Sequence, residues 1–102
     1  MTEAQIQAKI IAHLKKEGWE PVKLIQTNTN GIPDLMALRN GVALFIEVKR
    51  PGLNAAPLQA YRIEKLQKNG FTAFVARSVE DVANVIKALM YEVKSTVTAT
   101  KY

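Results

Sequence analysis

Cysteine is absent from this chain of 102 residues, and histidine occurs once, at His13. Without cysteine the chain can form neither a disulfide nor a thiolate metal site, and a single histidine excludes a zinc site built from several histidines. No apolar run approaches the roughly 20 residues that a membrane-spanning helix needs. The first residues, MTEAQIQAK, lack the apolar segment of a signal peptide. We therefore expect a soluble, cytoplasmic protein with no membrane partner.

Acidic residues are fewer than basic ones, and the formal net charge is +5. Lysine and arginine neutralise phosphates and release counterions, so a small basic domain is a candidate for nucleic-acid binding. Charge alone leaves the alternative open, because many basic domains never bind nucleic acid. On length, we expect one domain over residues 1–90. The tail over 91–102 is rich in threonine and valine, and its structure is left unassigned: a frayed end, an added strand and a dimer contact are all open.

Apolar periodicity and turn formers predict an alternation of helices and strands. Thr2 and Gln5 can form a capping box for the first helix, and Asn-Gly at 40–41 marks a hairpin turn. Helices are predicted over 2–17, 58–68 and 78–89, and strands within 19–26 and over 34–38, 42–49 and 71–76. The order α-β-β-β-α-β-α gives an α/β fold, in which three strands form an antiparallel meander and a helical crossover adds the fourth in parallel. We expect a central mixed sheet flanked by helices on both faces, with the third strand in its interior.

The stretch LFIEVKRPG, residues 44–52, places a carboxylate and an ammonium on one side of an otherwise apolar strand. Side chains alternate across a strand, so Glu47 and Lys49 point the same way, about 7 Å apart at ~3.3 Å rise per residue. Asp34 begins the neighbouring strand nearly opposite Glu47, and we expect a small bulge or an asymmetric turn to bring the two level.

Two facing carboxylates repel each other unless a proton or a cation lies between them. Mg²⁺ or Mn²⁺ suits such oxygen ligands. Lys49 could then orient the attacking water or stabilise charge on a phosphate, which points to phosphodiester hydrolysis. The alternative is that Glu47 and Lys49 form an exposed ion pair of little consequence.

Four segments in order closely resemble the VRR-NUC family, a branch of the PD-(D/E)xK nucleases. They are GIPDL (31–35), FIEVKRPG (45–52), PLQAYRIEKLQKNG (57–70) and FVARSVEDV (74–82). The resemblance runs from about residue 3 to about residue 86, and the predicted order of elements matches the core of that superfamily. It implies a Mg²⁺- or Mn²⁺-dependent DNA endonuclease in a bacterial or phage-infected cell. Small stand-alone members resemble Holliday-junction resolvases in organisation, which implies a homodimer that selects branched DNA.

The resemblance also implies roles for individual residues. Asp34 and Glu47 would be the metal-binding carboxylates, and the backbone carbonyl of Val48 would join them. Lys49 would be the catalytic lysine. Gln59, early in the helix after the third strand, matches a glutamine that reaches the active site.

Three more residues are candidates for the same site. Glu3 matches an acidic residue of the first helix that lies near the metal, although a first-turn carboxylate that favours the helix dipole is the alternative. Arg50 and Arg62 are the best candidates for phosphate contacts because they lie near the predicted site in sequence. Taken singly, any surface lysine or arginine is more often a solvated charge.

Other functions stay open from the sequence. One is a nuclease with flap, nick or general duplex preference, and another is a non-catalytic DNA-binding module that keeps the fold. Converging carboxylates argue against the module because they repel phosphates. A small regulatory domain that binds protein is compatible with the charge but leaves the acidic constellation unexplained.

Overall fold

The computed structural model describes residues 1–99, and the side chains of residues 1–91. The elements are α1 (Glu3–Lys16), β1 (Glu20–Lys23), β2 (Leu35–Arg39), β3 (Val42–Val48), α2 (Pro57–Lys68), β4 (Thr72–Ala76) and α3 (Val79–Ala99). The predicted order is confirmed, and so is the capping box, in which Thr2 and Gln5 exchange backbone-to-side-chain hydrogen bonds of 2.8 and 3.2 Å.

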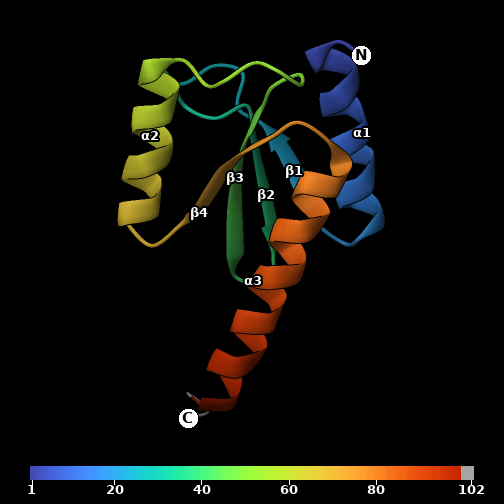
Figure 1. Cartoon of the computed structure of the whole chain (residues 1–102). Helices are drawn as coiled ribbons and strands as arrows, with labels where there is room; N and C mark the ends of the chain where they lie inside the picture. The colour runs from blue at the N-terminus through green and yellow to red at the C-terminus, as the bar shows by residue number, and fades with distance from the viewer. Residues whose placement is uncertain (100–102) are drawn as a thin grey trace.

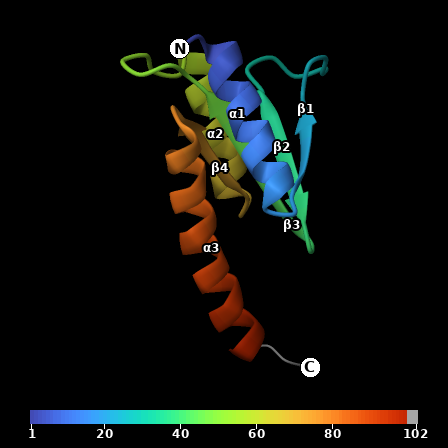
Figure 2. The same ribbon diagram turned by 90° about the vertical axis from the view of Figure 1, so that its right-hand side faces the viewer.

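The strands form one mixed sheet in the order β1-β2-β3-β4. β1, β2 and β3 pair antiparallel and β4 is parallel to β3, so the third strand lies in the interior as predicted. α1 and α3 cover one face and contact each other, while α2 lies on the other face against β4 (Figures 1 and 2). The crossover from β3 to β4 therefore buries β3 between two helical layers, which explains its long apolar run.

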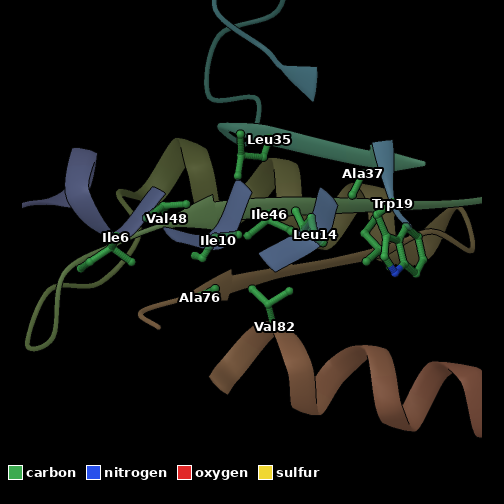
Figure 3. Close-up of a cluster of buried hydrophobic side chains, with 11 residues drawn as sticks. Ile6, Ile10, Leu14, Trp19, Leu35, Ala37, Ile46, Val48, Ala76 and Val82 are labelled. Atoms are coloured by element: carbon green, nitrogen blue, oxygen red, sulfur yellow. The ribbon is translucent and has the colours of Figure 1, made fainter. Parts of the chain in front are cut away.

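The main core lies between the sheet and the layer of α1 and α3 (Figure 3). Its buried members are Ile6, Ile10, Leu14, Trp19, Leu35, Ala37, Leu44, Ile46, Val48, Ala76 and Val82. On β3 these are the even-numbered residues, so the odd-numbered Glu47 and Lys49 point to the opposite face. Each fully buried aliphatic side chain contributes about 1.5–3 kcal/mol. The core thus fixes which face of β3 carries the polar pair.

A tight turn sets the register between β2 and β3. Arg39 pairs with Val42, and the two residues between them have positive φ, 48° at Asn40 and 79° at Gly41. This is the type I′ geometry that Asn-Gly favours. The prediction of a bulge or an asymmetric turn is wrong. The two-residue turn pairs Leu35 with Ile46, and the same register continued outward places Asp34 opposite Glu47.

The last helix is longer than predicted. The prediction ended at residue 89 and left 91–102 without a structure, whereas the backbone of α3 is helical to Ala99 and extends past the sheet (Figure 2). Val82 is buried against the core, and Tyr91 is 76% exposed. Residues 100–102 lie outside the described part. Within the described residues, no helix has the length and apolar character needed to cross a membrane.

Candidate active site

One end of the sheet gathers the predicted site residues. β1, β3 and β4 end there, β2 begins there, and α1, α2 and α3 all have their first turns at this end (Figure 1). The N-terminus of a helix carries a partial positive charge from its unpaired backbone N–H groups. Three such ends around one edge of the sheet favour the binding of an anion there.

Asp34 and Glu47 face each other across the ends of two paired strands. The ladder joins Leu35 to Ile46, so the next residues outward are Asp34 and Glu47. Residues opposite each other on antiparallel strands have Cβ atoms about 4.5–5.5 Å apart. The predicted pairing of these carboxylates is therefore present in the fold.

Val48 connects the two carboxylates through its backbone. Asp34 Oδ2 accepts the backbone N–H of Val48 at 2.9 Å. The N–H of the following residue, Lys49, points to the other side and donates to the carbonyl of Ala76 at 3.0 Å. Because the N–H and C=O of one strand residue point to the same edge, the carbonyl of Val48 is directed toward Asp34. This orientation agrees with the predicted use of that carbonyl as a ligand.

Glu47 is a buried carboxylate with an unusual proton affinity. The residue is 1% exposed, and its Oε2 lies 3.6 Å from the Nζ of Lys49, whose side chain is 16% exposed. Desolvation, and next the negative charge of Asp34, raise the pKa of Glu47 to about 7 although Lys49 opposes the shift. The second oxygen, Oε1, is buried and has no hydrogen-bond partner. A buried carboxyl with a charged partner and a perturbed pKa is typical of functional sites.

These oxygens fit a hard divalent cation. A buried oxygen without a partner loses solvation that a cation would restore, and Mg²⁺ or Mn²⁺ is commonly held by one or two carboxylates. In the part of the chain that is described, no three acidic or histidine side chains come close enough to form a metal cluster. A cation here would therefore rest on Asp34, Glu47 and the Val48 carbonyl, with its remaining ligands from water and substrate.

Glu3 and Gln59 occupy the edges of this site. Glu3 Oε2 accepts the backbone N–H of Arg50 at a long 3.5 Å, which brings the first turn of α1 beside the residue that follows Lys49. Gln59 Oε1 accepts the N–H of Ala56 at 2.8 Å and so caps α2. The carboxamide oxygen of Gln59 thus serves the helix in this structure, and its predicted role toward the substrate stays a prediction.

The two predicted phosphate-binding arginines have different surroundings. Arg50 is exposed and directly follows Lys49. Arg62 donates from Nε to the carbonyl of Asn30 at 3.0 Å, and its Cζ lies 5.3 Å from the centre of the Tyr61 ring. The exposed side chain of Arg50 is therefore accessible to a phosphate. The guanidinium of Arg62 is already hydrogen-bonded to the loop between β1 and β2 and stabilises that loop.

Arg77, which no sequence motif marked as a site residue, holds the segment after Lys49 in place. Its guanidinium donates to the carbonyl of Leu53 from two nitrogens, at 3.1 and 2.8 Å, and to Asn54 Oδ1 at 2.9 Å. Its own backbone N–H donates to Asp81 Oδ2 at 2.8 Å. Leu53 and Asn54 lie 24 and 23 positions before Arg77 in the sequence, and no local pattern signals such a contact.

Gly31 allows the loop before Asp34 to pack directly on α2. Its φ is +80°, and a Cβ built there would lie 2.7 Å from Leu58 Cγ and 3.0 Å from the Leu58 carbonyl oxygen. A larger residue is excluded both by conformation and by space. This contact fixes the approach of the chain to Asp34.

Comparison with known proteins identifies the same family that the motifs resemble. The family model of the VRR-NUC domain matches residues 1–80. "Putative nuclease p44" of Acyrthosiphon pisum secondary endosymbiont phage 1 is 30% identical over 88 residues, which cover 85% of this chain and 94% of the phage protein.

Solved structures give the same result. A structure described as a VRR_NUC domain superimposes with a TM-score of 0.75 at 29% identity, covering 85% of this chain and 97% of its own. A second, described as a VRR_NUC domain protein, has a TM-score of 0.72 at 26% identity and covers 86% and 87%. The sheet and helices described above are therefore shared with these structures.

Proposed function

The chain belongs to the VRR-NUC domain family of nucleases, and we propose that it is a divalent-metal-dependent DNA endonuclease that hydrolyses phosphodiester bonds at the Asp34–Glu47–Lys49 site. One observation carries the proposal. Glu47 is buried opposite a second carboxylate, with an unpartnered oxygen and with Lys49 as its cationic neighbour. Burying a carboxylate with an unpartnered oxygen is destabilising, so a strand with only a structural role is not expected to carry one. A site that holds a divalent cation for phosphate chemistry requires such carboxylate oxygens.

Each residue of the site has a proposed task. Asp34 and Glu47 would hold the cation together with the Val48 carbonyl, and the N–H of Val48 keeps Asp34 in place at 2.9 Å. A bound divalent cation would polarise the phosphoryl group and make a water more acidic. Lys49 places a positive charge at the mouth of the site, where it stabilises the charge that develops on the phosphate.

The surroundings favour a polyanionic substrate. The net charge is +5, the first turns of three helices surround the site, and Arg50 is exposed next to Lys49. These charges attract phosphates on either side of the scissile bond, while the carboxylates alone would repel them. Glu3 and Gln59 are proposed to act at the rim, and Arg62 to contact a flanking phosphate from α2.

The proposal extends to the form of the enzyme and of its substrate. The described residues of this small domain form one such site, and resolution of a four-way junction requires two cuts. A homodimer would present two sites to a branched duplex, so we propose a dimer with selectivity for branched DNA. The phage relative supports a role in the cytoplasm of a bacterial or phage-infected cell.

The test is cleavage of a labelled panel: a four-way junction, a flap, a linear duplex and a single strand. Wild-type protein and Lys49→Ala are compared with Mg²⁺, with Mn²⁺ and with EDTA, and light scattering gives the mass in solution. The proposal expects metal-dependent cutting that is lost in Lys49→Ala and greatest on the junction. Binding without cutting under either metal would support the DNA-binding module instead, and preference for the flap or duplex would reject junction selectivity.

A further inference from the structure

The loop between β1 and β2 carries the most exposed large apolar side chain among the described residues. Ile25 is 85% exposed. It directly follows Leu24, whose backbone N–H donates to the carbonyl of Asp34 at 2.9 Å. An apolar, β-branched side chain thus projects into solvent next to a residue whose backbone is hydrogen-bonded to Asp34, a proposed metal ligand.

The loop that presents Ile25 is held at several points. Arg62 binds the Asn30 carbonyl, and Gly31 packs on Leu58 as described above. Between Ile25 and Asn30, the Thr27 hydroxyl donates to the Thr29 carbonyl at 2.8 Å. The side chain of Ile25 is therefore presented by an ordered segment, which lowers the entropic cost of using it in a contact.

Ile25 is more exposed than the other large apolar side chains at this end of the sheet, where Met1, Leu53 and Leu58 are 71%, 39% and 45% exposed. Single exposed apolar side chains are normal on a protein surface. Leu38 is 39% exposed and Phe71 is 47% exposed, but both lie at the opposite end of the sheet, near the β2–β3 turn and the start of β4. Ile25 is on the rim of the site, and Gln26 and Asn28, both exposed amides, follow it on the loop. An apolar wedge followed by amides is a combination that proteins use to insert into the minor groove and unstack base steps.

We propose that Ile25 is a wedge that inserts between bases beside the scissile phosphate and distorts the DNA so that the backbone reaches Asp34 and Glu47. This inference rests on the proposed nuclease function and specifies how that site engages its substrate. Unstacking is easiest where pairing is already broken. Ile25 should consequently matter for a fully paired duplex and matter little where a mismatch or branch opens the helix at the cleavage position.

Base unstacking can be measured without cleavage. The probe is a duplex with 2-aminopurine near the cleavage position, titrated to saturation with Lys49→Ala protein alone or combined with Ile25→Ala, Ile25→Met or Leu38→Ala. We expect a fluorescence increase with Lys49→Ala that is lost on adding Ile25→Ala and retained with Ile25→Met and Leu38→Ala. The wedge proposal would be overturned if fluorescence increased equally with Lys49→Ala and with the Lys49→Ala, Ile25→Ala double variant, or if it increased with none of the proteins.

Cleavage by proteins that keep Lys49 gives the second readout. Ile25→Ala should cut the paired duplex at least about tenfold more slowly than wild type and cut a duplex with a mismatched bubble at nearly the wild-type rate. Equal defects on both substrates, or a change in oligomeric state in Ile25→Ala without DNA, would reject the wedge in favour of a general or dimer-contact role. The nuclease proposal fails separately, if cleavage by wild-type protein does not depend on Lys49.

Discussion

Asp34 Oδ2 accepts the backbone N–H of Val48 at 2.9 Å, which joins the start of β2 to the end of β3. Replacing Asp34 by asparagine keeps an acceptor for that N–H and removes the charge. We predict that Asp34→Asn folds with a melting temperature close to that of wild type. Loss of one cation ligand should lower cleavage by at least about 10²-fold.

The measurement for Asp34→Asn pairs thermal melting in EDTA with single-turnover cleavage. Glu64→Gln is the control for loss of one carboxylate charge, because Glu64 is exposed on α2 and pairs only with Lys68, at 3.2 Å, among the described residues. Cleavage by Asp34→Asn at the wild-type rate would show that the metal site is assigned to the wrong residues.

Glu47 makes stability depend on pH in a direction opposite to that of most carboxylates. Its folded-state pKa is raised to about 7 from 4.5, so the folded protein binds the proton more tightly than the unfolded chain. The stabilising contribution is present below about pH 4.5 and is lost as pH rises through about 7. With about 1.4 kcal/mol per pKa unit, the loss in EDTA is on the order of a few kcal/mol.

Urea unfolding in EDTA at pH 5, 6, 7 and 8 tests this prediction. In Glu47→Gln the free energy of unfolding should decrease less between pH 5 and pH 8 than in wild type. This variant should be more stable than wild type at pH 8. Mg²⁺ or Mn²⁺ should raise the stability of wild type at pH 8, and that of Glu47→Gln much less. An equal pH slope in both proteins would contradict the assigned pKa.

Gly31 is predicted to be intolerant of alanine. The substitution adds the strain of a positive φ and a clash with the Leu58 backbone, together about 1–3 kcal/mol, and it shifts the loop that leads to Asp34. Gly70→Ala is the control, because Gly70 has φ +88° but open space around a built Cβ. Gly31→Ala should lose more stability than Gly70→Ala and should alone lose activity, and equal effects would refute the packing argument.

Arg77 is predicted to act by positioning the segment after Lys49. Arg77→Ala should speed amide exchange over residues 50–54 and lower kcat about tenfold or more, since small displacements of a catalytic group are costly. Arg77→Lys keeps the charge but loses the paired contacts to Leu53, so it should resemble alanine. Full activity of Arg77→Lys would indicate that charge rather than geometry matters.

Much of the fold was predictable because its signals are local. The capping box at Thr2, the Asn-Gly turn at 40–41 and the alternation along β3 each act over a few residues, and each is present in the structure. The pairing of Asp34 with Glu47 was predicted from the turn, but the level register was missed. Turn type depends on the φ values of Asn40 and Gly41, which the sequence favours without fixing.

Other features could not be predicted, because they depend on packing between distant segments. Arg77 donates hydrogen bonds to the Leu53 carbonyl, and Arg62 donates one to the Asn30 carbonyl. These contacts form only where the folded sheet brings distant loops together. The use of the Gln59 oxygen to cap α2 competes with the catalytic role that its motif implied. The helical extension to Ala99 was missed although its signal is local, since Val93 and Val97 continue the helical spacing that begins at Val82.

We propose that Lys49, Asp34 and Glu47 catalyse phosphodiester hydrolysis, and a comparison of cleavage rates provides the decisive test. Single-turnover cleavage of the preferred DNA substrate is measured at saturating protein and Mg²⁺ or Mn²⁺ for wild type, Lys49→Ala and Lys68→Ala. Lys68 is an exposed lysine paired with Glu64 at 3.2 Å on α2 and serves as the charge-matched control. We predict that the cleavage rate of Lys49→Ala is at least about 10²-fold lower than that of wild type, while the rate of Lys68→Ala stays within about twofold of wild type. Equal rates for wild type and Lys49→Ala would contradict it.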